Sequence, residues 1–286
     1  MNKAAITETL RSLTGADPVC WLPLGGGCVG EVAKVGLSNG KTLIVKSGKT
    51  GSGLDIEGYM LRYLKDQSDL PVPSVLHAAD ELLVMSYIHT SGRLNASAQA
   101  HAADLLAALH AMTGPAYGLD RDTLIGGLHQ PNPATDSWIE FFRDHRLLYM
   151  AEQAEQAVRL PRRVRARVEK LCEHLDRWLT EPDAPRLIHG DVWSGNVLCG
   201  KDGKIAGFVD PAIYYADPEI ELAFSTLFNT FGAPFFARYQ QLRPIAPGFF
   251  EERRDLYNLY PLLVHVRLFG GSYVTSVENS LARFGF

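Results

Sequence analysis

The chain has few of the features that mark secreted, membrane-spanning or zinc-binding proteins. Its 286 residues include only four cysteines, and no two of them form a CxxC pair, which argues against a zinc site or a disulfide framework. No apolar run approaches the roughly 18 residues of a membrane span, and the amino terminus lacks the apolar block of a secretion signal. A net charge of −4 gives no large basic field for nucleic acid. We therefore expect a cytoplasmic protein that binds neither membrane nor nucleic acid.

The first third of the chain has the apolar pattern of a small sheet. Asn39-Gly40 is typical of a hairpin turn between two strands. Ser52, with Asp55 three residues later, resembles a capping box, and the apolar residues that follow recur at helical spacing. Two more short apolar strands come before residue 88. This pattern predicts an antiparallel sheet with one helix packed on it.

The rest of the chain is mainly helical. A polar stretch at 89–97 reads as a linker, and amphipathic segments follow it, one of them predicted over 162–180. With 46% hydrophobic residues, a chain of this length can bury a sizeable core. We predict an α+β protein with two lobes: an amino-terminal nucleotide-binding lobe, 1–88, and a larger, mainly helical catalytic and acceptor-binding lobe, 89–286.

A cluster of polar residues interrupts an apolar run at LIHGDVWSGNVLC, residues 187–199. Asp191 and Asn196 have the spacing of the base and the metal-binding asparagine in a kinase catalytic loop. Asp210 ends the following strand, where a second metal ligand is required. A tight turn capped by an aspartate is the alternative, but acid, amide and acid in a strand-turn-strand pattern favour chemistry. The pattern predicts Asp191 as the catalytic base, with Asn196 and Asp210 as ligands of Mg²⁺.

The amino-terminal lobe supplies candidates for binding the phosphates of ATP. A glycine-rich turn precedes Lys46, which lies on a strand, and Glu57 lies in the next helix, as in the kinase lysine and its partner. Singly, these residues would read as a loop and two solvated charges, so the prediction depends on their order. The residues that we assign to the turn are Gly25, Gly26, Gly27 and Cys28. The Cys28 thiol is also a candidate site of oxidation, with an inert small residue as the alternative.

Three further residues near these motifs are assigned on weaker grounds. His189 is favoured as a buried support of the loop, because Asp191 already holds the position of the base. His110 is favoured as structural. Trp193 could belong to the core, but its place between Asp191 and Asn196 favours an acceptor pocket bordered by its ring.

The segments HGDVWSGN and FVDPAIYYADPEIELA resemble the fructosamine-3-kinase (ketosamine-3-kinase) family, whose protein-kinase-like fold is related to that of aminoglycoside phosphotransferases. The resemblance covers nearly the whole chain. It includes LPLGGGCVGEV, LIVKS, LVMSYI, IGGLHQPN, SWIEFFRDHRL and LYNLYPLLVHVRLFGGSY. Two positions depart from the family: Glu221 stands where aspartate is more frequent, and Pro261 interrupts a helical stretch.

The resemblance implies ATP-dependent phosphorylation of the third-carbon hydroxyl of a ketosamine of the fructosamine or ribulosamine type. The acceptor would be a small molecule or a glycated lysine of a protein, and the phosphorylated adduct would then be lost. Lys46 with Glu57 would order the phosphates, and backbone groups at Ser86, Tyr87 and Ile88 would meet adenine.

Three other functions stay open on the sequence alone. An aminoglycoside kinase or another small-molecule kinase would use the same ATP machinery. A protein kinase is disfavoured because little room for an activation segment follows Asp210 and no APE motif occurs. A pseudokinase or scaffold is disfavoured because Lys46, Asp191, Asn196 and Asp210 are all intact.

Overall fold

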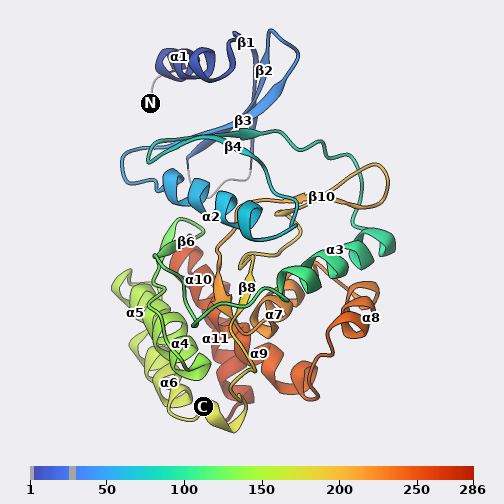
Figure 1. Cartoon of the computed structure of the whole chain (residues 1–286). Coiled ribbons are helices and arrows are strands. Elements are labelled where there is room, and N and C mark those ends of the chain that lie inside the picture. Colours follow the sequence, from blue (N-terminus) through green and yellow to red (C-terminus); the bar gives the residue numbers. More distant parts are fainter. Residues whose placement is uncertain (1–2, 26–29) are drawn as a thin grey trace.

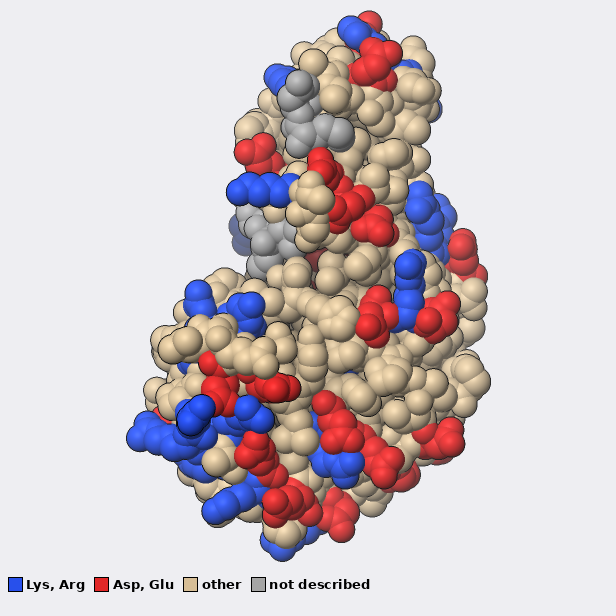
Figure 2. Space-filling view, turned by 90° about the vertical axis from the view of Figure 1, so that its left-hand side faces the viewer, with Lys and Arg blue, Asp and Glu red and all other residues tan. Residues whose placement is uncertain are grey.

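The computed structural model describes residues 3–25 and 30–286, which form a smaller upper lobe and a larger lower lobe (Figure 1 and Figure 2). The upper lobe contains a five-stranded sheet in the order β1-β2-β3-β5-β4, and every neighbouring pair is antiparallel. Its elements are α1 (Lys3–Thr14), β1 (Pro18–Leu24), β2 (Glu31–Leu37), β3 (Thr42–Ser47), α2 (Leu54–Gln67), β4 (Val75–Ala79) and β5 (Leu82–Ser86). The predicted antiparallel sheet with a packed helix is confirmed.

The central strands of the sheet are buried on both faces, and the alternation of side chains along β3 and β5 explains how. Leu82 and Val84 point to the face that packs against α1, whereas Leu83 and Met85 point to the face that packs against α2. On β3 the same period of two places Lys46 on the opposite face from Val45. Lys46 therefore faces α2, where Glu57 lies in the first turn.

Helix α2 begins differently from the sequence prediction. Gly53 is its N-cap, with a φ of 67° that favours glycine, and no side chain caps the helix. The Ser52 hydroxyl donates instead to the carbonyl of Lys49, at 2.5 Å. The Asp80 carboxylate accepts from the amide of Gly53, at 2.8 Å. The predicted capping box is therefore wrong, because an aspartate distant in the sequence holds this turn.

The lower lobe contains most of the helices and three small two-stranded antiparallel sheets (Figure 1). One sheet pairs β8 (Arg186–Ile188) with β11 (Tyr214–Ala216), and two are hairpins, β9 (Val197–Cys199) with β10 (Ile205–Phe208) and β6 (Thr123–Ile125) with β7 (Leu128–Gln130). The α-helices are α3 (Ala96–Leu109), α4 (Trp138–Phe142), α5 (Tyr149–Gln156), α6 (Arg162–Cys172), α7 (Glu219–Leu227), α8 (Ala233–Leu242), α9 (Arg254–Tyr257), α10 (Leu259–Phe269) and α11 (Ser272–Arg283). Two π-helical segments, Arg143–Leu148 and Phe249–Arg253, precede α5 and α9, and a 3₁₀ turn spans Leu175–Arg177.

Helix boundaries in the lower lobe differ in two places from the pattern of the sequence. The helix predicted over 162–180 ends at Cys172, and the chain continues through the 3₁₀ turn. Pro261 lies in the first turn of α10, where a missing amide hydrogen removes no intrahelical bond. The helical stretch is divided at Asn258, just before that turn. No helix within residues 3–25 and 30–286 is long and apolar enough to cross a membrane.

Candidate active site

Two backbone hydrogen bonds and a glycine hold the loop between β8 and β9 in shape. The amide of Ala212 donates to the carbonyl of His189, at 2.8 Å, and the amide of Val209 donates to the carbonyl of Asn196, at 3.1 Å. Gly190 has a φ of 85°, and a β-carbon there would lie 2.1 Å from the carbonyl oxygen of Ala212. Only glycine therefore lets the β8 end of the loop approach β11.

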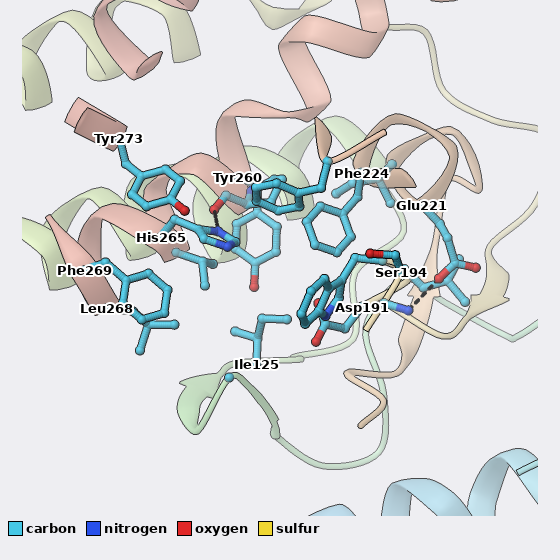
Figure 3. Close-up of a pocket in the computed structure, with 18 of the residues that line it drawn as sticks. Ile125, Asp191, Ser194, Glu221, Phe224, Tyr260, His265, Leu268, Phe269 and Tyr273 are labelled. Atoms are coloured by element: carbon cyan, nitrogen blue, oxygen red, sulfur yellow. Dashed lines mark hydrogen bonds between the residues drawn. The ribbon is translucent and has the colours of Figure 1, made fainter. Parts of the chain in front are cut away.

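Glu221, from the first turn of α7, supports this loop. One of its carboxyl oxygens accepts from the amide of Gly190, at 2.6 Å (Figure 3). The other lies 2.7 Å from Nε2 of His110. The second ring nitrogen of His110 lies 2.7 Å from the hydroxyl of Tyr239. Both His110 and Glu221 are buried. The glutamate that departs from the family pattern thus reaches the loop, and His110 has a structural environment.

Asp191 lies partly buried at the centre of the loop. Asn196 donates from its side-chain nitrogen to the carboxylate of Asp191 and to the carbonyl of Asp191, both at 2.9 Å. Burial and the neighbouring Asp210 raise the pKa of Asp191 to about 7, and the hydrogen bond from Asn196 opposes them. His189 is buried beside this loop, and burial lowers its pKa, so its ring is a neutral acceptor for the amide of Asp191.

Lys46 lies between two carboxylates, one from each lobe. Its ammonium lies 2.7 Å from Glu57 in α2 and 2.5 Å from Asp210 after β10. Burial disfavours the charge on Lys46, but the two carboxylates outweigh it, and the pKa of Lys46 is raised. The pKa of Glu57 is also raised by burial, which its pairing with Lys46 opposes. The predicted lysine, glutamate and aspartate are therefore brought together in space.

The donors around Asp210 suit a hard cation that shares its ligands with a nucleotide. Asp210 has a φ of 53°, an uncommon backbone conformation outside glycine that is enriched at functional sites. Asn196 uses its nitrogen to contact Asp191, which leaves its oxygen for a metal. No cluster of three or more histidine, cysteine, aspartate or glutamate side chains that could hold a metal occurs among the described residues. Mg²⁺ takes few protein ligands and completes its shell with phosphates and water, so this set fits it.

An apolar cavity of about 350 Å³ lies between the sheet and the loop. Its lining includes five of the six described residues that the sequence assigned to the nucleotide: Gly25, Lys46, Ser86, Tyr87 and Ile88. Glu57 and Lys46 line a smaller cavity beside it, together with Asp191 and Asp210. Gly26, Gly27 and Cys28 lie outside the described residues, so their predicted roles stay predictions.

A second cavity, of about 450 Å³, opens on the other side of the loop. Figure 3 shows Asp191 and Ser194 on one side of it, with His265, Phe269 and Tyr273 on the opposite side. Trp193 lines this cavity and both cavities of the nucleotide side, with 37% of its surface exposed. A β-carbon on Gly195 would lie 2.4 Å from the Trp193 ring, so the glycine lets the ring lie across the loop. Trp193 therefore borders the cavity that reaches Asp191.

Most of the second cavity was missed by reasoning from the sequence. Its apolar side chains come from the β6–β7 hairpin, α7, α10 and α11, among them Ile125, Phe224, Tyr260 and Leu268. No motif marks them, and the aromatic content of LYNLYPLLVHVRLFGGSY was the one available signal.

A buried arginine stands behind this cavity. Arg146, from the π-helical segment, is fully buried and lies with its guanidinium 3.8 Å from the centre of the Tyr214 ring. It donates to the carbonyl of Pro131 and to the side-chain oxygen of Asn132, at 2.7 and 2.6 Å. Arg146 therefore supports the floor of the cavity from behind the Tyr214 ring.

Comparison with known proteins gives consistent matches over both lobes. A family model for fructosamine kinase matches residues 5–284. The chain is 39% identical over 208 residues to a probable ketoamine kinase of Synechocystis sp., covering 71% of this chain and 68% of that protein. It is 31% identical to the chloroplastic protein-ribulosamine 3-kinase of Oryza sativa subsp. indica, covering 97% of this chain and 86% of that protein.

A solved structure matches the fold as well as the sequence. The crystal structure of a presumed fructosamine-3-kinase from Thermobifida fusca YX-ER1 has a TM-score of 0.87 and 30% sequence identity, with 98% of each chain covered. This match confirms the predicted class, a two-lobed, kinase-like α+β fold.

Proposed function

Because this chain belongs to the fructosamine kinase family, we propose that it transfers the terminal phosphoryl group of ATP to the third-carbon hydroxyl of a ketosamine. The observation that carries this proposal is the position of Asp191. Its side chain lines both the acceptor cavity and the small cavity that contains Lys46, Asn196 and Asp210. A hydroxyl bound in the first cavity would therefore face a phosphate bound in the second.

Asp191 acts on the acceptor hydroxyl. Its carboxylate orients the hydroxyl and accepts its proton as the oxygen attacks the phosphorus atom. The hydrogen bond from Asn196 fixes the carboxylate in one rotamer, and Glu221 fixes the backbone through the amide of Gly190. Positioning of this kind contributes much of the catalysis in phosphoryl transfer, because the reaction needs little covalent chemistry from the protein.

The charged groups of the cleft bind the phosphates. Lys46 places a cation on the nucleotide side of the loop, and Glu57 holds it there. Asp210 and the side-chain oxygen of Asn196 would hold Mg²⁺, which neutralises charge that develops on the phosphates. The division of the chain near residue 88 places these groups on both lobes. We propose that this division separates the nucleotide-binding lobe from the acceptor-binding lobe.

Adenine binds against β5 and the segment after it. The amide of Ser86 already donates to the carbonyl of Ser74, at 2.9 Å, so that donor is used. The amide of Ile88 makes no hydrogen bond to another described residue. We assign recognition of the base to Ile88 and the carbonyl of Ser86, with Tyr87 in the cavity wall. A cytoplasmic location agrees with the use of ATP.

A panel of acceptors tests the function. Purified protein is incubated with Mg-ATP and with ribulosamines, fructosamines and aminoglycosides, and the phosphorylated products are identified. Phosphorylation of ketosamines at the third-carbon oxygen is expected. Products from aminoglycosides alone would overturn the assignment, and no product from any acceptor would favour a scaffold. Asp191→Asn is expected to retain ATP binding and to lose about 10²–10⁴-fold in turnover.

A further inference from the structure

A row of aromatic rings leads from the catalytic loop to the outer part of the acceptor cavity. The ring centre of Phe228 lies 6.5 Å from Trp193 and 5.0 Å from His265. The centre of the His265 ring lies 4.9 Å from Tyr273 and 5.7 Å from Phe269. All five residues line the cavity, and we call them the aromatic wall.

The cavity offers no positive charge to a ligand. Among the described residues that line it, none is lysine or arginine, and the only carboxyl groups belong to Asp191 and Glu221. The two oxygens of Glu221 already contact Gly190 and His110. A carboxylate on the ligand would therefore find no cationic partner here, and it would share the cavity with two acidic side chains.

His265 does not supply the missing charge. Its Nδ1 lies 2.7 Å from the carbonyl of Pro261, so this nitrogen carries the hydrogen and Nε2 is an acceptor. Burial lowers the pKa of His265, with the Pro261 contact opposing it, and the ring is neutral at pH 7. The aromatic wall thus carries ring faces, one neutral nitrogen acceptor and the uncharged hydroxyl and N–H groups of Tyr273 and Trp193, but no cation.

We infer that the aromatic wall binds the amine substituent of the ketosamine, and that this substituent is an apolar chain or ring without a carboxylate. The inference rests on the proposed function, because it takes the reacting hydroxyl to lie at Asp191. In a ketosamine the amine nitrogen is bonded to the first sugar carbon, near the reacting third carbon, so its substituent extends from the loop into this cavity.

The chemistry of the wall fits that group in two ways. A secondary amine is protonated at neutral pH, and aromatic faces attract such a cation. An apolar substituent gains about fourfold in affinity for each methylene that it buries. An alkylamine, an arylamine or the aliphatic stem of a lysine side chain meets these requirements. A free amino acid glycated on its α-amine does not, because its carboxylate would lie beside the rings.

A matched pair of acceptors tests the inference on the unmodified protein. The two acceptors are the ribulose adducts of n-butylamine and of 4-aminobutyrate. They have the same number of carbon atoms and differ in one group, because a carboxylate in the second replaces the terminal methyl of the first. We expect kcat/KM to be at least about tenfold higher for the butylamine adduct, since burial of an unpaired charge is unfavourable. Equal or faster phosphorylation of the 4-aminobutyrate adduct overturns the inference while supporting the proposed function. Phosphorylation of neither adduct, nor of any other ketosamine, overturns both.

A variant at the rim gives the wall a positive charge. Phe269 ends α10 and is 56% exposed, so a long polar side chain fits there without repacking the core. Phe269→Arg is expected to raise kcat/KM for the 4-aminobutyrate adduct about fivefold, as for a partly exposed ion pair. Phe269→Gln controls for the loss of the ring, and Phe250→Arg, at a 41% exposed phenylalanine outside the cavity lining, controls for net charge. The same response in all three variants would contradict the placement of the substituent.

Discussion

Removal of the Glu221 side chain should loosen the catalytic loop as well as the core. In Glu221→Ala, the amide of Gly190 and the ring nitrogen of His110 both lose their acceptor, in surroundings that are buried or partly buried. Each unsatisfied donor costs about 1–3 kcal/mol, so the two together should lower the free energy of unfolding by about 2–6 kcal/mol. A displacement of the loop by about 1 Å can reduce turnover by about 10²-fold.

Urea unfolding and steady-state kinetics measure these two effects. Glu221→Gln is the matched control, because its amide oxygen can accept from Gly190 and its amide nitrogen can donate to the other tautomer of His110. We expect Gln to retain most of the stability and activity that Ala loses. Glu221→Asp is shorter by one methylene and should keep only one of the two contacts, with an intermediate loss. Wild-type unfolding and wild-type turnover in Glu221→Ala would refute the support that we assign to this residue.

Four more changes have defined outcomes. Asp210→Ala should abolish turnover while circular dichroism stays unchanged, and normal turnover in the folded variant would remove Asp210 from the metal site. Trp193→Ala should raise KM for the ketosamine by about threefold to tenfold, through loss of aromatic contact, whereas an unchanged KM would place the sugar elsewhere. Because the pKa of His189 is lowered in the folded protein, the unfolded chain takes up a proton first as the pH falls, so stability present above pH 6.5 is lost below it. The free energies of unfolding at pH 7.5 and pH 5.5 should therefore differ less in His189→Asn than in the wild type. An equal difference in the two proteins would contradict this assignment. Reversible loss of activity on oxidation should disappear in Cys28→Ser, and the same sensitivity in that variant would rule the thiol out.

Local pattern was sufficient for the part of the site that lies on short motifs. The order of the residues predicted that Lys46 on a strand would pair with Glu57 in the next helix, and spacing in the loop predicted that Asp191 and Asn196 would belong to one site. The structure brings both pairs into contact. Both predictions depend on residues that are near each other in the chain. The start of α2 could not be predicted in the same way, because Asp80 holds the turn before it from 27 residues along the chain.

The acceptor cavity, by contrast, could not be predicted from local patterns in the sequence. Phe228 follows α7, His265 lies in α10 and Tyr273 in α11, and only the packing of these helices brings the rings together. Each ring alone reads as an ordinary core residue, since helices that pack on one another are aromatic and apolar in any case. A cavity built from several helices leaves no spacing in the sequence, so its chemistry becomes visible only in the fold.

The position of Trp193 should make its intrinsic fluorescence sensitive to the binding of both substrates. Of the four tryptophans, Trp193 alone lines the cavities described above, whereas Trp138 is fully buried in the core and Trp21 and Trp178 contact other parts of the structure. Indole emission depends on the polarity and the quenching groups around the ring. Binding of a nucleotide on one side of the Trp193 ring, or of an acceptor on the other, should therefore change its fluorescence. Titration with either substrate alone would then give the dissociation constant of that substrate in the absence of turnover.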